Sequence, residues 1–216
     1  MIRSRTYHPR YLVPVRFLAA AIALCFASAA IADRLILIPL GKKLLSNTLR
    51  YEVLTESSRD NTLGWIGGGI GHSFDFEITG ESFNDNRMTN SLDFAYNYTV
   101  PIVDFAPGVS FGLQDVLGVT ERGRNAYMAV TYRFGNSGEL NQDIPTEFTI
   151  GLWSRREGAV FAGVRLPFSH TLSLIAEHDS VNITGGFEIS PHETASFRFL
   201  FRQSQVIVGL RVQARF

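Results

Sequence analysis

The sequence is almost free of cysteine. Its single cysteine, Cys25, lies in an apolar run near the N-terminus, within a segment that we expect to be removed. The remaining chain has no cysteine, which excludes a disulfide framework even in a compartment that would permit one. The fold must therefore be stabilised by other means.

No apolar run is long enough for a membrane-spanning helix, which needs about 20 residues. The N-terminal run FLAAAIALCFA (17–27) follows a leader that has no acidic residue and contains Arg3, Arg5, Arg10 and Arg16. Ala30-Ile31-Ala32 then supplies the small-x-small pattern of a cleavage site. Residues 1–32 are predicted to be a secretory signal peptide cleaved before Asp33. Lipidation of Cys25 is disfavoured, because Leu24 stands where a small residue is needed.

The chain also lacks an excess of charge, with 20 basic and 20 acidic residues. Loss of the arginine-bearing leader leaves a mildly acidic protein without a basic patch, so we expect no nucleic-acid partner. There is no phosphate-binding loop, dinucleotide fingerprint or Cys/His zinc spacing, and the glycine run GWIGGGIG is not followed by Lys-Ser/Thr. We expect no cofactor and no metal site, since the histidines fall at separate strand ends or turns, at His72, His170, His178 and His192.

What the sequence does contain is alternation with a period of two, the pattern of strands with two different faces. SFDFEITGE (73–81), SLDFAYNYTV (91–100) and SFRFLFR (196–202) each alternate large apolar residues with polar or small ones. Turn residues separate such runs at strand-length intervals. The pattern predicts about twelve strands, at 47–56, 61–70, 72–82, 88–100, 107–117, 124–135, 145–155, 158–166, 170–178, 181–189, 194–202 and 205–216.

The apolar face of these strands could line a soluble core or face lipid. The polar positions carry bulky charged residues beside glycine and serine, which is typical of a barrel lumen. Large aromatics stand near strand ends, where interfacial girdles lie, at Tyr51, Phe74, Tyr98, Tyr132 and Phe216. We therefore predict an all-β fold, an antiparallel transmembrane β-barrel of about twelve strands, with ten as the alternative. The barrel is expected over 47–216, after a lead-in segment 33–46 in which 34–41 is a lead-in strand or a plug.

The last twelve residues, QVIVGLRVQARF, alternate strictly and end on an aromatic residue. A barrel in lipid must close, because unpaired backbone groups are too costly there, so its terminal strand cannot fray. The ending resembles the C-terminal signature of bacterial outer-membrane barrels. That resemblance implies an assembly signal made by Leu210, Val212, Ala214 and Phe216, with outer-membrane lipid and the barrel-assembly machinery as partners.

Residues 100–216 resemble the YjbH-like exopolysaccharide-associated outer-membrane proteins. The similar stretches are PGVSFGLQDVLGV, AYMAVTYRFG and FAGVRLPFSHTLSLIAEHDSVNITGGFEI. Gly112, Leu113 and Asp115 match the family pattern, whereas Gln114 replaces a basic residue. The resemblance implies a single-barrel version of a longer family and a link to polysaccharide production or export, with polysaccharide or export proteins as partners. It supplies no catalytic residue.

Inward-facing charges supply the candidate site. Acidic and amide residues on two predicted strands, Glu177, Asp179, Asn182 and Glu188, lie near basic residues on the next two, Arg198, Arg202, Arg211 and Arg215. Neighbouring strands are about 4.8 Å apart, so these columns can pair across the lumen. They form a structural network or, alternatively, part of a ligand path. Trp65 and Trp153 are either interface anchors or stacking surfaces for sugar rings.

A catalytic interpretation is weaker. Glu177, His178 and Asp179 suggest a rim protease, and Ser169, His170 and Asn182 suggest a phospholipase, but alternation turns His178 away from its neighbours. We therefore expect no catalytic residue and a non-enzymatic outer-membrane barrel, linked to exopolysaccharide export or acting as a narrow or plugged pore. The alternatives are a rim-active outer-membrane hydrolase and a soluble periplasmic binding barrel.

Overall fold

The computed structural model describes residues 32–44, 46–57, 61–71, 73–82, 88–120, 123–135, 144–154 and 158–216. The predicted signal peptide, up to residue 31, and His72 lie outside these ranges. Among the described residues there is no helix long and apolar enough to cross a membrane.

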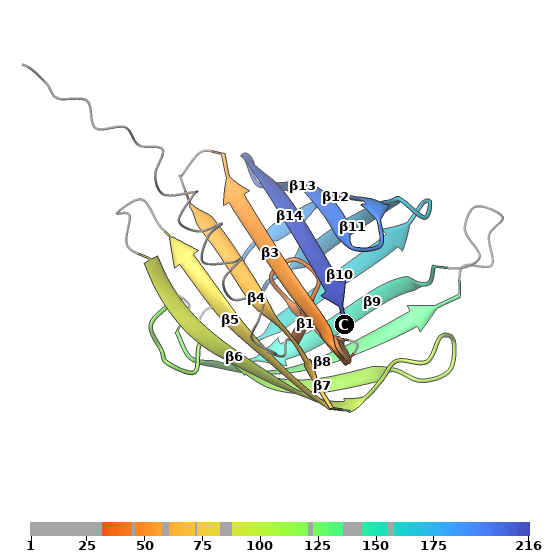
Figure 1. The fold of residues 1–216 in the computed structure, drawn as a ribbon, viewed down its shortest axis with the longest axis horizontal. Helices are drawn as coiled ribbons and strands as arrows, with labels where there is room; N and C mark the ends of the chain where they lie inside the picture. The colour runs from red at the N-terminus through yellow and green to blue at the C-terminus, as the bar shows by residue number, and fades with distance from the viewer. Residues whose placement is uncertain are drawn as a thin grey trace, which may run out of the picture.

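Twelve antiparallel strands form a closed barrel, which confirms the predicted fold class and strand number (Figure 1). Each strand pairs with its neighbours in sequence, and the last pairs with the first. The predicted boundaries agree with the observed ones to within three residues. The strands are β3 (Thr48–Glu56), β4 (Thr62–Ile70), β5 (Phe74–Ser82), β6 (Met88–Thr99), β7 (Gly108–Gln114), β8 (Asn125–Phe134), β9 (Thr146–Trp153), β10 (Val160–Pro167), β11 (Leu172–His178), β12 (Ile183–His192), β13 (Ala195–Arg202) and β14 (Gln205–Arg215).

Apolar side chains face outward and charged ones face the lumen, as the alternation predicts. On β13, Phe197 and Phe199 are 45% and 44% exposed, whereas Arg198 between them is fully buried. Val208 on β14 is likewise exposed, and it pairs with Phe199. A lipid environment favours this orientation, because a soluble barrel would bury the phenylalanines in its interior.

The terminal strand closes the barrel. β14 pairs with β3 from Ile207–Glu56 to Arg215–Thr48, and the Phe216 amide donates to the carbonyl of Asn47 at 3.0 Å. Leu210, Val212, Ala214 and Phe216 share its outward face, and Phe216 is exposed. The assembly role of these residues stays a prediction. We call the end of the barrel where β3 begins and β14 ends the base, and the opposite end, which holds the β7–β8 and β11–β12 connections, the mouth.

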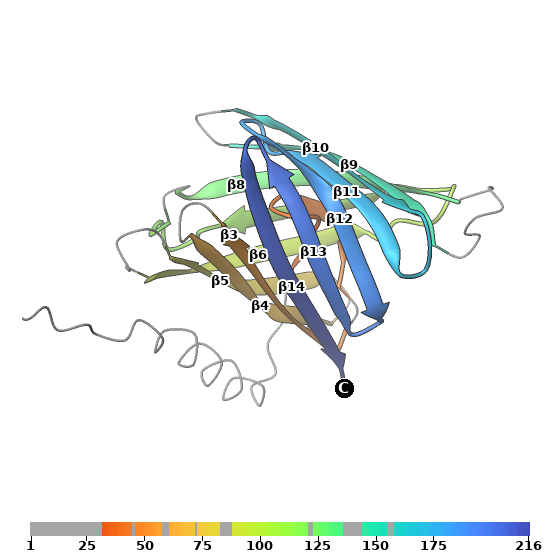
Figure 2. The ribbon, with the colours of Figure 1, turned by 90° about the horizontal axis from the view of Figure 1, so that it is seen from above.

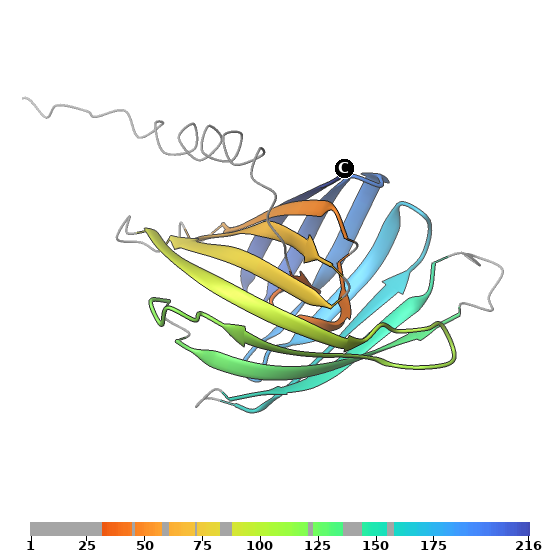
Figure 3. The same cartoon turned by 60° about the horizontal axis from the view of Figure 1, so that its bottom comes forward.

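A short hairpin precedes the barrel and lies inside it. β1 (Ala32–Arg34) and β2 (Pro39–Lys43) pair only with each other, as a separate two-stranded sheet. Figures 2 and 3 show this hairpin, at the red end of the colour scale, enclosed by the ring of strands. Residues 32–43 are called the plug hairpin below.

Candidate functional site: a hairpin docked in a charged lumen

The plug hairpin has the sequence of a short buried element. Leu35, Ile36, Leu37 and Ile38 form its turn, and all four are at most 1% exposed. The turn is closed by a hydrogen bond from the Leu35 amide to the Ile38 carbonyl, at 3.0 Å. Pro39 follows as the first residue of β2, a position that tolerates the missing N–H. Cations flank the apolar turn on both sides, with Arg34 before it and Lys42 and Lys43 after it.

The turn donates its backbone hydrogen bonds to one carboxylate. Glu177, near the mouth end of β11, accepts from the amides of Ile36 at 3.0 Å, Leu37 at 2.9 Å and Ile38 at 3.2 Å. Successive N–H groups that converge in this way form a nest for a carboxylate group. Glu177 therefore fixes the tip of the plug hairpin, a role that joins residues 140 positions apart.

An apolar patch of the lumen surrounds the tip. Phe161, Ile175, Leu200 and Ile207 are inward-facing, at most 2% exposed, and belong to the same buried cluster as the tip. Gly163 on β10 leaves the space that the tip fills, since a Cβ there would stand 2.5 Å from Leu35 Cδ2. A wholly polar lumen would not retain this turn. The lumen is thus apolar where it meets the tip.

The second strand of the hairpin lies against the wall made by β7 and β8. Gly41 approaches so closely that a Cβ would meet the Gly108 carbonyl oxygen at 2.5 Å. The Gly41 amide donates to Thr131 Oγ1 at 2.7 Å, and Ser110 Oγ donates to the Leu40 carbonyl at 2.7 Å. These are side-chain contacts rather than a strand ladder. The hairpin is therefore docked on the sheet without being part of it.

Arg34 holds the hairpin to an acidic wall. Its guanidinium forms ion pairs with Glu77 on β5 and with Asp93 on β6, the latter at 3.0 Å, and lies 5.0 Å from the Trp65 ring centroid. Glu77 and Asp93 are direct register partners, so their carboxylates stand side by side. Arginine over the face of tryptophan is a favourable cation–π pair.

One glycine shapes this wall. In register across four strands stand Arg50, Gly67, Glu77 and Asp93. Two strand spacings, about 9.6 Å, separate the backbones of Arg50 and Glu77. Because Gly67 has no side chain, Arg50 extends across it, and its Nη2 lies 3.5 Å from Glu77 Oε2.

Lys42 makes a second electrostatic contact, near the base. Its Nζ donates to both oxygens of Glu147 on β9, at 2.8 and 2.7 Å. Glu147 also has barrel partners, with Arg133 Nε at 3.2 Å and Arg165 Nη1 at 4.0 Å. Its charge is therefore compensated within the wall even without the hairpin.

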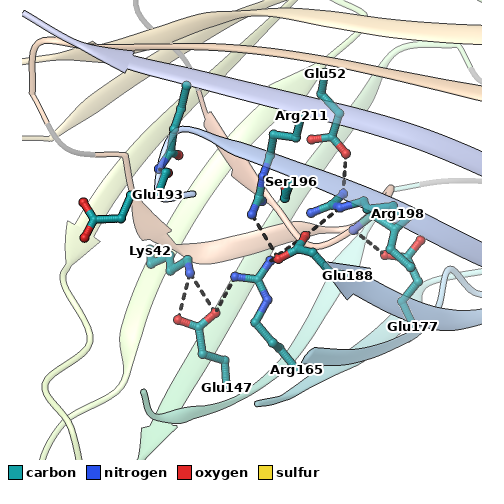
Figure 4. A network of polar contacts seen from close by, with 12 residues as sticks. Lys42, Glu52, Glu147, Arg165, Glu177, Glu188, Glu193, Ser196, Arg198 and Arg211 are labelled. Carbon is teal, nitrogen blue, oxygen red and sulfur yellow. Dashed lines mark hydrogen bonds and ion pairs between the residues drawn. The ribbon is translucent and has the colours of Figure 1, made fainter. Parts of the chain in front are cut away.

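The arginines of the last strands converge on Glu188, as Figure 4 shows. Its carboxylate pairs with Arg165 at 3.0 Å, Arg198 at 2.7 Å and Arg211 at 3.1 Å. Arg198 also pairs with Glu52 on β3, and all these groups are largely buried. Such a network cross-links β10, β12, β13, β14 and β3, and narrows the lumen opposite the acidic wall.

Arg202 and Asp179, two further predicted residues, lie near the mouth. Arg202 donates to Thr184 Oγ1 at 2.8 Å and pairs with Glu56 at 3.2 Å. Asp179 accepts from the amides of Val181 and Asn182, at 3.1 and 2.7 Å, and so caps the β11–β12 turn.

One expected placement is wrong. Asn182 lies in that turn rather than on an inward strand face, and Gln203 Nε2 donates to its side chain at 3.0 Å. Arg215 is exposed at the end of β14, where it pairs with the buried Thr48 and so shares the inward face of the strand.

Both tryptophans face the lumen. Trp65 is 2% and Trp153 4% exposed, so neither anchors the barrel at a lipid interface. Trp153 packs against Phe161 with ring centroids 4.6 Å apart, and its Nε1 donates to Ser180 Oγ at 2.8 Å. Trp153 therefore supports the apolar patch, whereas Trp65 lies beneath Arg34.

The Glu177, His178 and Asp179 cluster does not form a hydrolytic set in the described part of the chain. The Glu177 carboxylate is engaged by hairpin amides, Asp179 is engaged by the turn, and His178 is exposed on the opposite face. A general base must lie within about 3 Å of the proton that it accepts, and these groups do not converge.

Sequence reasoning missed Arg34, Lys42, Glu77 and Asp93 as partners. The acids were visible as alternating polar positions, but nothing local indicated their role. The available signal was the segment RLILIPLGKK, an apolar run bracketed by cations.

No family model and no curated protein matches this chain. The solved structures similar to it include the KdgM porin and the KdgM porin in complex with disordered oligogalacturonate. Each has a TM-score of 0.51 and 12% sequence identity, and the alignment covers 78% of this chain and 99% of the porin. KdgM is a different named family from the one that the sequence resembles. At this identity the similarity establishes a porin-like barrel fold.

Proposed function

We propose that this protein is a non-enzymatic outer-membrane pore that is closed by its own N-terminal hairpin, residues 32–43. The observation that carries the proposal is the position of the hairpin, which lies inside the lumen yet forms a sheet separate from the barrel (Figure 2). Its withdrawal would break side-chain contacts but no strand ladder of the wall. The barrel can therefore stay closed as a sheet while its lumen opens.

Three features support the membrane location. The outward face is apolar, with exposed residues such as Phe199 and Val208, the sheet has no free edge, and the similar solved structures are porins. The link to exopolysaccharide export comes only from the sequence resemblance, and it remains part of the proposal.

The contacts of the hairpin favour the closed state strongly. Burial of each apolar side chain of the tip contributes roughly 1.5–3 kcal/mol. The Glu177 hydrogen bonds and the ion pairs of Arg34 and Lys42 add to this. Spontaneous opening is therefore expected to be rare. A solute or a partner that binds at one end of the barrel would have to stabilise the open state.

Conductance across a planar bilayer tests the proposal. The variant that combines Glu177→Ala with Lys42→Ala removes two hairpin contacts and leaves the Glu188 network intact. We expect the unmodified chain to be closed for most of the recording and the double variant to raise the open fraction at least about tenfold. Glu193→Gln is the matched control, because it removes an exposed carboxylate on the β12–β13 turn.

Two outcomes would contradict the proposal. The double variant could be folded and have a protease-accessible hairpin, yet show no conductance. The protein would then be a structural scaffold rather than a pore. Recovery of the native protein in the soluble periplasmic fraction after osmotic shock would exclude the membrane location. Resistance to SDS until heating verifies that each variant is folded.

A further inference from the structure

We infer that the pocket now filled by the Arg34 guanidinium is the solute site of the open pore, and that it binds cationic groups of the guanidinium or alkylammonium type. The inference rests on the proposed function, since the pocket becomes free only when the hairpin leaves. Arg34 acts there as an internal ligand that shows which chemistry the wall accepts.

The pocket combines two carboxylates with an aromatic face. Glu77 and Asp93 supply paired acceptors, and Trp65 supplies a ring whose centroid lies 5.0 Å from the Arg34 guanidinium carbon. Carboxylate pairs suit the fork of a guanidinium or the three donors of an ammonium group, and tryptophan is the best aromatic partner for a cation.

The wall keeps these groups in place without Arg34. Asp93 accepts from Thr79 Oγ1 at 2.9 Å and, through its other oxygen, from the Asp115 amide at 2.7 Å. Glu77 has Arg50 as a second partner, at 3.5 Å. After Arg34 has left, Arg50 alone does not neutralise the two buried carboxylates of Glu77 and Asp93. The empty pocket would therefore carry negative charge and attract a cation.

A hollow at the mouth connects with the pocket. It contains about 320 Å³ of empty space, its open side included, and its lining includes Arg34, Trp65, Glu81, Asp93 and Asp115. A cation that enters here passes Asp115 and Glu81 before it reaches Asp93.

The Trp65 indole points to a ligand as well. Trp65 is almost fully buried, and its Nε1 has no hydrogen-bond partner in the described part of the chain. A buried N–H without an acceptor is costly, and a solute with a hydroxyl or carbonyl group beside its cation could satisfy it. The acids of the hollow would repel anionic sugars, so we expect a solute unlike the oligogalacturonate of the similar porin structure.

The Lys42 contact does not form an equivalent site. Glu147 keeps Arg133 and Arg165 as partners when Lys42 is removed. Removal of Arg34, in contrast, takes away the main positive charge that faces Glu77 and Asp93. Lys42→Ala is therefore the matched control for Arg34→Ala, because each removes one cation from the same hairpin.

The test is binding of methylguanidinium to the folded full-length protein in detergent, measured by calorimetry. We expect Arg34→Ala to bind it at least tenfold more tightly than the unmodified chain or Lys42→Ala. Adding Asp93→Asn to Arg34→Ala should abolish the gain, and acetate should not bind. Arg34→Gln serves as a second variant, with a shorter polar side chain that leaves the guanidinium position free, should the alanine variant fail to fold.

Equal binding by the Arg34 and Lys42 variants, or a gain that survives Asp93→Asn, would overturn the inference. Binding does not depend on conductance, so the two proposals fail separately. A double variant that conducts without selective cation binding would refute only the solute site. Selective binding in a barrel that never conducts would refute the pore and leave a cation-binding pocket without a role in transport.

Discussion

Replacement of Glu177 by alanine should release the plug hairpin while the barrel stays folded. Glu177 is the common acceptor for the amides of Ile36, Leu37 and Ile38, and those donors lie in an apolar part of the lumen. The substitution removes no strand pairing and none of the arginine contacts of Glu188. The substitution should therefore lower the stability of the docked hairpin and leave the stability of the barrel nearly unchanged.

The structure gives the size of the effect. Leaving a buried donor unsatisfied costs about 1–3 kcal/mol, so three such amides could cost about 3–9 kcal/mol. Water that enters the space of the lost side chain recovers part of this, and we use the lower end, about 3 kcal/mol. Because 1.4 kcal/mol corresponds to a factor of ten, the population with an undocked hairpin should rise about a hundredfold.

Limited trypsin cleavage measures that population. The hairpin carries trypsin sites after Arg34, Lys42 and Lys43, and Arg34 is 4% exposed in the docked state. When opening and closing are fast, the cleavage rate follows the fraction that is open. We expect cleavage about a hundred times faster in Glu177→Ala and an unchanged rate in Glu193→Gln. If trypsin cuts a folded Glu177→Ala barrel no faster than the unmodified protein, then Glu177 does not hold the hairpin in its docked position.

Three further predictions concern the barrel itself. Arg198→Ala should lower the free energy of unfolding by about 3–5 kcal/mol, seen in urea titration of the reconstituted protein, because it strands the buried carboxylate of Glu52. A change within 1 kcal/mol would argue against a buried network. Phe199→Arg should cost about 2–4 kcal/mol in the same assay, since it places a charge on the lipid face, whereas a soluble barrel would tolerate it. Burial acts to raise the pKa of Asp115, but hydrogen bonds from Ser91, Thr120 and backbone amides outweigh it and hold the pKa below its ordinary 3.8. Its contribution to the β7–β8 connection should thus persist from neutral pH down past 3.8 and fade only below. Hydrogen-exchange protection of the Val119 and Thr120 amides tests this, and protection already lost at pH 5 would contradict it.

The wall of the barrel was predictable because the residue pattern within each strand is sufficient to identify that strand and its two faces. Phe197, Arg198 and Phe199 alternate in a way that only a two-faced sheet explains, and turn residues mark where each strand stops. The closing role of the last strand followed from the same physics, since lipid leaves no partner for a free edge.

The interior was harder to predict because its contacts join distant parts of the chain. Leu35 to Ile38 form an unbroken apolar run with no period, and their surroundings depend on Glu177, far along the sequence. Likewise, the partners of Arg34 are brought together by the register of β4, β5 and β6. Leu200 and Ile207 occupy inward positions, which alternation alone assigned to a polar lumen, because they receive the tip of the hairpin.

The central claim is that the hairpin occupies the lumen, and cysteine labelling tests it most directly. Cys25→Ser gives a cysteine-free background, in which Leu37→Cys reports on the tip and Phe105→Cys on a surface position. Leu37 is 1% exposed and Phe105 84% exposed. In the folded protein, a membrane-impermeant maleimide should modify the cysteine at 37 at least about a hundred times more slowly than the one at 105, and Glu177→Ala should remove most of that difference. Equal rates in a folded barrel would mean that the hairpin lies outside the lumen, and the account would be wrong.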